Sequence, residues 1–170
     1  PKINAWYVHA YTDLGLTSTS YVKADHAIKI EFVGSSSGGI TVDSVAGINL
    51  QGDINNPNGT TKITSSNGDI KAGSGAVINS KTTELTAKGS IASDAQALRL
   101  ITSNVTARAG GLVNLDLTAQ NASAINANFS AGSGLTVNSN VSLQALGTGT
   151  HIKAKQVNIN SGGAIGSNNA

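Results

Sequence analysis

The acidic residues whose spacing could build a catalytic pair are Asp43, Asp53 and Asp69. On adjacent turns of one face, two carboxylates roughly 5 to 10 Å apart would supply the acid and base of glycoside cleavage. An Asp that follows glycine also serves at corners, where it accepts hydrogen bonds from the backbone. The acids are dispersed along the chain, which favours the structural role, and we expect that the chain is not an enzyme.

Residue types that hold metals or phosphates are sparse. Cysteine is absent, and His9, His26 and His151 lie far apart in the sequence. Asp25 is adjacent to His26, and neighbours in a strand point to opposite faces. The chain lacks the calcium-binding β-roll repeat, the EF-hand loop, the phosphate loop and the Gly-x-Ser-x-Gly motif. We therefore expect no bound metal and no cofactor.

Aromatic residues gather near the start of the chain, at Trp6, Tyr7, Tyr11 and Tyr21. Their flat apolar rings make them a candidate contact for a carbohydrate or a protein partner. The alternative is a structural role, in which the same rings cap the fold or meet a preceding coil. Both hypotheses stay open at the level of sequence.

Composition narrows the classes of partner. The formal net charge is +2, and Lys and Arg are scattered, which argues against a nucleic-acid partner. No apolar run approaches the roughly 20 residues that span a bilayer, and no signal peptide is visible. Disordered chains combine high net charge with few β-branched residues. Here Ile, Val and Thr recur at short intervals, so we expect an ordered chain without membrane insertion.

The elements that position these side chains are short strands. Apolar and polar residues alternate in runs such as AIKIEF (27–32), GITVDSV (39–45) and GINLQGDI (47–54), separated by Gly, Asn or Ser. About fifteen such runs of about five residues occur, and none has the period of a helix.

Two all-β architectures fit many short strands: a sandwich or barrel, and a parallel β-solenoid. Small aliphatic inward residues, few hairpin turns and internal similarity favour the solenoid. We predict an all-β, right-handed parallel β-helix of roughly seven to nine coils.

A Gly-x-Ile sequence closes several of the alternating runs. Because glycine permits a tight bend without a Cβ, we assign structural turn roles to four glycines: Gly52, Gly68, Gly89 and Gly163. The segments GSIAS (89–93) and GAIGS (163–167) indicate two divergent copies of a longer unit. Ala92 stands where the second segment has glycine, so a positive φ there would force the first copy to turn differently.

The chain is predicted to be one β-solenoid segment, 1–170, excerpted from a longer repeat protein. Residues 1–32 would form aromatic-rich first coils, and residues 33–60 an insertion rich in loops. Asparagines at strand ends, such as Asn55 and Asn104, are expected to align into ladders between stacked coils, because Asn hydrogen-bonds readily at corners.

Several stretches carry a family likeness. A sequence pattern recurs in the repeats of very large bacterial surface proteins, the filamentous-haemagglutinin-like and leukotoxin-type filamentous adhesins. Two stretches resemble this pattern: GSIASDAQALRL (89–100) and NVTARAGGLVNLDLTA (104–119). Two more stretches are similar to other sequence patterns of these repeats: GGAIGSNNA (162–170) and GDINNPNGTTKITSSNGDI (52–70). The resemblance implies a parallel β-helix, export across the outer membrane, and adhesive or scaffolding work. It supplies no catalytic residues.

The expected function is a structural shaft segment of a large extracellular bacterial adhesin or filament that mediates surface attachment or cell-cell contact at the bacterial cell surface. Its partners would be neighbouring repeats of the same chain, or identical subunits end to end, because open coils expose unpaired strand edges. Host or cell-surface glycans are further candidate partners. The alternatives are a self-assembling extracellular filament, sheath or surface-layer subunit, and a polysaccharide-active β-helix enzyme.

Overall fold

The computed structural model describes residues 2–3, 7–11, 20–24, 28–33, 38–149 and 151–166, and before residue 38 it describes the backbone alone. The described residues form sixteen β-strands and no helix. The prediction of an all-β chain is therefore confirmed.

The strands follow one another along the chain with short connections. They are β1 (Lys2–Ile3), β2 (Tyr7–Tyr11), β3 (Ser20–Ala24), β4 (Ile28–Val33), β5 (Gly39–Ser44), β6 (Ile48–Ser65), β7 (Ile70–Ala72), β8 (Val77–Ala87), β9 (Leu98–Thr102), β10 (Asn104–Ala109), β11 (Val113–Ala119), β12 (Ala124–Ala131), β13 (Gly134–Ser139), β14 (Ser142–Ala145), β15 (Ile152–Lys153) and β16 (Gln156–Ser161).

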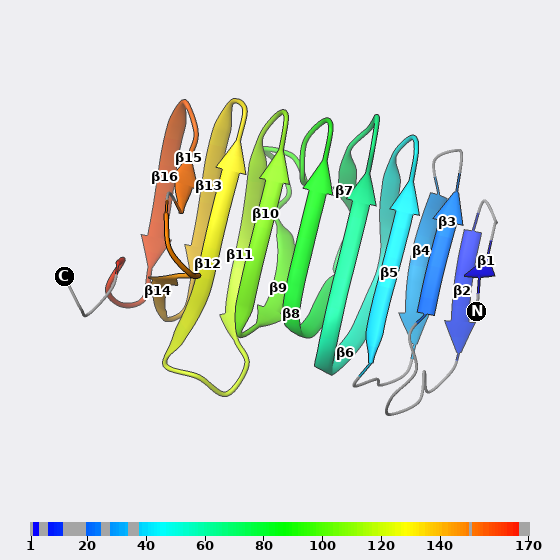
Figure 1. Cartoon of the computed structure of the whole chain (residues 1–170), viewed down its shortest axis with the longest axis horizontal. Helices are drawn as coiled ribbons and strands as arrows, with labels where there is room; N and C mark the ends of the chain where they lie inside the picture. The colour runs from blue at the N-terminus through cyan, green and yellow to red at the C-terminus, as the bar shows by residue number, and fades with distance from the viewer. Residues whose placement is uncertain are drawn as a thin grey trace.

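Every pair of these strands that forms a ladder is parallel, and the chain winds as a β-solenoid of about six turns. Figure 1 shows the coils side by side along the long axis, from the β1 end to the β16 end. Parallel neighbours need a crossover connection, which here is the rest of the coil. The solenoid prediction is confirmed, and the sandwich and barrel alternatives are wrong.

The strands of the described coils stack on three faces, which we number in chain order. The first face stacks β3, β5, residues 60–65 of β6, residues 82–87 of β8, β10 and β12. The second stacks β2, β4, the start of β6, β7, the start of β11, β13 and β16. The third stacks the middle of β6, the start of β8, β9 and the end of β11. Equivalent residues such as Thr82 and Asn104 are 22 positions apart.

Inward residues in register form columns along the axis. One column on the second face runs Ile48, Ile70, Ile91, Val113 and Leu135, and each of these side chains is at most 1% exposed. Fully burying such a side chain stabilises a fold by about 1.5–3 kcal/mol. The columns therefore form the core, and each coil depends on the coils on either side of it.

Asparagine ladders cross the coils as predicted. The Asn79 Nδ2 donates to Asn55 Oδ1 at 2.9 Å, and the Asn126 Nδ2 donates to Asn104 Oδ1 at 2.9 Å. A second polar set is fully buried where the third face meets the first. There the hydroxyls of Thr61 and Ser80 lie 2.7 Å apart. Hydrogen bonds between coils thus satisfy the hydroxyls of Thr61 and Ser80, which burial would otherwise penalise.

The stretch 33–60 differs from its expected loop-rich character. It contains β5 and most of β6, whose inward residues Ile40, Val42 and Ile54 are fully buried. Within its described residues the register of β6 shifts twice, with β4 between Leu50 and Ile54 and with β8 between Asn56 and Thr60. The polar and glycine-rich composition of this stretch reflects outward positions and a bulge in a continuous coil.

The two echoed segments occupy different places in their coils. Ile91 pairs with Ile70 and Val113 on the second face, whereas Ile165 pairs with Leu143 beside β12. The interpretation of two copies of a longer unit is therefore wrong, because the structural repeat is a single coil. The same Gly-x-Ile sequence suits several corners.

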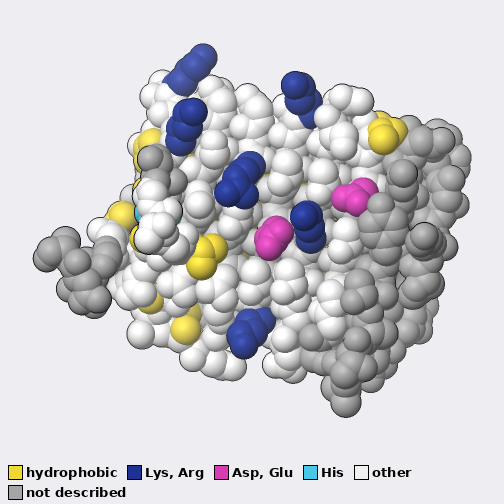
Figure 2. Space-filling model, in the orientation of Figure 1, with side chains coloured by type: hydrophobic (Ala, Val, Ile, Leu, Met, Phe, Trp, Pro, Cys, Tyr) yellow, Lys and Arg dark blue, Asp and Glu magenta, His cyan; other side chains and the backbone are white. Residues whose placement is uncertain are grey.

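Outward side chains are mostly small and polar. Figure 2 shows a few Lys, Arg, Asp and Glu side chains scattered over one face of the solenoid, with wide uncharged areas between them. Lys62 and Glu84 lie in register on neighbouring strands, with Nζ and Oε2 3.9 Å apart. Both are about half exposed, so the pair contributes little to stability. In the described part of the chain, no helix has the length and hydropathy needed to span a membrane.

Candidate binding groove

A groove of about 440 Å³ lies on the second face near the β16 end. Strands β11, β13 and β16 stack side by side there, and the register pairs Thr136 with Asn114 on one side and Asn158 on the other. Side chains alternate along a strand, so these three positions share the face opposite the buried column of Val113 and Leu135. Of the three, Thr136 and Asn158 line the groove.

Gly134 makes room for the groove. It pairs with Gln156 on β16, and a Cβ built on Gly134 would meet no atom within 4 Å. Leu112 and Gln156 line the groove beside it. The missing side chain leaves an open notch over the backbone of β13.

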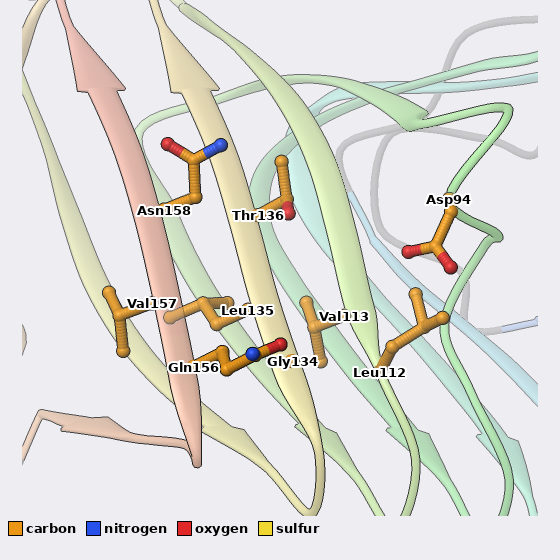
Figure 3. Close-up of a pocket in the computed structure, with 9 residues that line it drawn as sticks. All are labelled: Asp94, Leu112, Val113, Gly134, Leu135, Thr136, Gln156, Val157 and Asn158. Carbon is orange, nitrogen blue, oxygen red and sulfur yellow. The ribbon is translucent and has the colours of Figure 1, made fainter.

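A short loop after Ile91 brings Asp94 to the groove. Ser93 and Gln96 bridge each other through two backbone hydrogen bonds of 3.2 and 3.3 Å. Asn114 Nδ2 donates to the Ser93 carbonyl at 2.6 Å, which ties the loop to β11. Figure 3 shows the Asp94 carboxylate on this separate loop, across the groove from Thr136 and Asn158.

The groove offers hydrogen-bonding groups and one carboxylate. Asp94 is the single acid among the residues that line it, so it lacks the carboxylate pair that glycoside cleavage needs. Thr136, Gln156 and Asn158 can donate and accept hydrogen bonds from hydroxyl or amide groups. These groups could hydrogen-bond a polar ligand.

Two of the three acids considered from sequence, Asp53 and Asp69, accept backbone hydrogen bonds at corners, and Asp43 lies on β5. The backbone N–H of Val77 donates to Asp53 Oδ1 at 2.9 Å, and the backbone N–H of Ser90 donates to Asp69 Oδ1 at 2.8 Å. Each hydrogen bond joins a corner of one coil to the next coil, so Asp53 and Asp69 have a structural role at these corners. Among the described residues, no three His, Asp or Glu side chains lie close enough to hold a metal ion.

Three of the aromatic candidates, Tyr7, Tyr11 and Tyr21, lie on strands at the opposite end of the solenoid from the groove. Trp6 lies outside the described residues. Tyr7 and Tyr11 lie on β2 and Tyr21 on β3, where the backbone alone is described. Tyr7 pairs with Lys29 on the second face, and Tyr21 pairs with Lys2 and Thr41 on the first.

The predicted turn glycines lie at close approaches between coils. A Cβ on Gly68 would collide with the backbone of Ala46, one on Gly89 with the carboxylate of Asp69, and one on Gly163 with the hydroxyl of Ser142. In the described residues, positive φ values belong to other glycines, such as Gly75 at +81°, and to Ala92 and Asn121.

Two positions refine the glycine argument. Gly52 lies within β6, next to the register shift. Ala92 takes φ +65° itself, and Gly166 at the matching place in the second echo takes φ +125°. Both residues therefore have a positive φ, and the alanine adopts it although this conformation costs an L-residue about 1–2 kcal/mol.

Sequence reasoning missed the groove, because the row of polar residues that lines it appears only when the chain is aligned at the length of one coil. Aligning the chain at the 22-residue period places VNLD, LTVN and VNIN over one another, which puts Asn114, Thr136 and Asn158 in one outward row. The period itself was visible only once the register was known.

Comparisons with family models, curated proteins and solved structures found no match to this chain.

Proposed function

We propose that the chain is a structural shaft segment of a large extracellular bacterial adhesin or filament, displayed at the cell surface for attachment or cell-cell contact. The observation that supports this function is the stack itself: coil upon coil repeats the same parallel ladders and aliphatic columns. Stability in such a stack accumulates by contacts between neighbours, which suits a spacer of adjustable length. The likeness to filamentous adhesin repeats supports the same proposal.

The proposal includes a right-handed winding and seven to nine coils for the whole chain. Parallel crossover connections are right-handed in about 98% of cases because of the twist of the strands. The 22-residue spacing between Thr82 and Asn104, carried over 170 residues, agrees with this number of coils.

The proposed partners are neighbouring repeats of the same chain or identical subunits end to end. The second candidate function is a self-assembling filament, sheath or surface-layer subunit, in which the parallel ladders that join the coils would also join identical subunits. Cell-surface glycans are proposed as a further partner, with Trp6, Tyr7, Tyr11 and Tyr21 as their contact. We propose no catalytic role, since Asp53 and Asp69 bond to corner amides.

Deleting one whole coil tests the shaft. Asn104 and Asn126 occupy equivalent positions, so removing residues 104–125 joins two matching places and leaves the remaining coils able to stack. In the bacterium that carries the gene, we expect the shortened protein to label with antibody on intact cells and to keep most of its attachment.

Deleting residues 104–114 is the matched control, since it shifts all later strands by half a coil and should abolish display. Loss of attachment with the whole-coil deletion despite normal display would show that the segment carries a binding or catalytic site. Labelling that requires permeabilised cells would contradict a surface function.

A further inference from the structure

The corner between β6 and β7 is one residue longer than the same corner in the coils on either side. Its two ends are set by residues that pair in register with those coils: Ser65 with Ser44 and Ala87, and Ile70 with Ile48 and Ile91. Four residues, 66–69, join these ends, whereas three residues join them in the neighbouring coils, at 45–47 and 88–90. The corner therefore holds an extra residue, as a bulge does, that has no counterpart in the stack.

The longer corner contains an Asn-Gly sequence, Asn67 and Gly68. On either side of it, the N–H groups of Ser66 and Ile70 donate to carbonyls of the neighbouring coils at 2.8 and 2.9 Å. Within the described part of the chain, the N–H groups of Asn67 and Gly68 and the Asn67 side chain form no hydrogen bond. Asn67 is also exposed. Neither a ladder nor a side chain therefore holds the Asn67 carboxamide away from the Gly68 nitrogen.

An asparagine that precedes glycine can react with its own backbone. The Gly68 nitrogen attacks Cγ of Asn67 and forms a C–N bond, its proton passes to the leaving amide nitrogen, and ammonia departs. Water then opens the cyclic succinimide, either at Cγ to give aspartate or at the backbone carbonyl to give isoaspartate. The attack is intramolecular, so its rate depends on how freely the two groups can meet. Glycine favours it because no Cβ restricts the approach.

The chain has a second Asn-Gly sequence, Asn58 and Gly59, in a different setting. Asn58 is exposed, but Gly59 is buried within β6, where a Cβ would collide with the Gly38 carbonyl oxygen. The Gly59 carbonyl accepts a hydrogen bond from Ser80 Oγ at 3.4 Å. Ring closure at Asn58 would move the Gly59 nitrogen and disturb these contacts. The structure therefore separates two sites that share the same dipeptide.

We propose that Asn67 is a site of self-modification, where the Gly68 nitrogen converts the asparagine to aspartate and isoaspartate in the folded chain. Water is the only co-reactant. Each event lowers the formal net charge of +2 by one. Isoaspartate adds a carbon to the backbone of a corner that already holds an extra residue, so the ladders beyond Ser66 and Ile70 stay in register. The inference is independent of the proposed shaft function.

Incubation of the purified folded chain at neutral pH, in water labelled with heavy oxygen, tests the proposal. Peptide mass spectrometry should show labelled carboxylate at position 67 forming at least about tenfold faster than at position 58, because opening a packed strand requires more free energy than moving an unpaired corner. In concentrated urea the two sites should react within about threefold of each other, because neither glycine is then held by its neighbours.

Two variants separate the role of the side chain from that of the corner. Asn67→Gln keeps an exposed amide but lengthens the side chain, and should slow the reaction at this position at least about tenfold. Deletion of Ser66 keeps the Asn-Gly sequence but leaves three residues in the corner, which places Gly68 where the next coil has Gly89. It should slow the reaction at Asn67 at least about fivefold, provided that circular dichroism shows a folded chain.

Equal rates at Asn67 and Asn58 in the folded chain would overturn the proposal, since the dipeptide alone would then decide the reactivity. So would an Asn67 that reacts in urea but stays unmodified in the folded chain. Where the Ser66 deletion does not fold, the comparison of the two sites in folded and unfolded chains decides the matter.

Discussion

At the scale of single residues, glycine keeps adjacent coils close together. Gly68, Gly89 and Gly163 each lie where a Cβ would collide with the coil beneath, and none of the three has a positive φ. The sequence pattern identified these positions because glycine recurs beside isoleucine. Which atoms they make room for depends on the stacking of coils, which a single strand pattern does not contain.

Substitutions at two glycines distinguish the effect of a close approach between coils from the effect of backbone flexibility on stability. Gly68→Ala should lower the free energy of unfolding by at least about 2 kcal/mol, because overpacking against the Ala46 backbone forces the coils apart. Gly134→Ala, with open space around the new Cβ, should be neutral or raise it by up to about 1 kcal/mol. Urea unfolding followed by circular dichroism measures both values. Equal effects would contradict the collision argument.

At the scale of elements, each long strand turns a corner and pairs differently on either side of it. β6 pairs with β4 through Ile48 and Leu50, and with β5 through residues 60–65. Both β6 and β8 turn this corner, and buried hydroxyls lie there. Thr61 of β6 contacts Ser80 of β8, and Asn56 Nδ2 donates to Thr61 Oγ1 at 3.4 Å. The alternation predicted a strand that ends at residue 54, whereas β6 continues through the corner to Ser65, and the corner was visible only in the pairing.

The buried hydroxyl pair gives an element-level prediction. Thr61→Val keeps the shape and strand preference of the side chain but leaves the Ser80 hydroxyl without its 2.7 Å partner. We expect a loss of about 1–3 kcal/mol in the free energy of unfolding. Thr60→Val, at the exposed neighbouring position, is the control and should change it by less than about 0.5 kcal/mol. Similar losses in both variants would show that the buried pair is not what stabilises the corner.

At the scale of the whole molecule, the solenoid is a one-dimensional stack, and its central coils are covered on both sides whereas the coil that contains β16 is covered on one. Central coils have a neighbour on each side, and their inward residues, such as Leu85 and Val105, are fully buried. β16 is covered on one side by β13, and its side chains are exposed or half-buried. Local stability should therefore fall from the centre toward this end.

Amide exchange measures that gradient. The amides of residues 156–161 should exchange at least about tenfold faster than those of residues 104–109. Residues 126–131, on a covered strand, serve as an internal control and should exchange slowly. Uniform exchange along the chain would contradict a stack stabilised by its neighbours.

The amino-acid order alone was enough to specify strands. Alternation of Ile, Val and Leu with Ser, Thr and Asn sets which side of each strand is buried, and this periodicity is local. It was also enough to indicate a stack of small aliphatic columns rather than an aromatic core, and to locate Gly68 and Gly89 at corners.

Register, coil length and the surfaces that follow from them came from the folded chain. Ile91 and Ile165 share a local sequence yet occupy different columns. Asp94, Thr136 and Asn158 share a groove although 64 residues separate the first from the last. The physical reason is that pairing between coils depends on contacts about 22 residues apart, whose energies are summed over the whole stack. The alternating pattern of a strand determines which of its side chains point inward, whereas the packing of the stack determines which residues of the neighbouring coils those side chains contact.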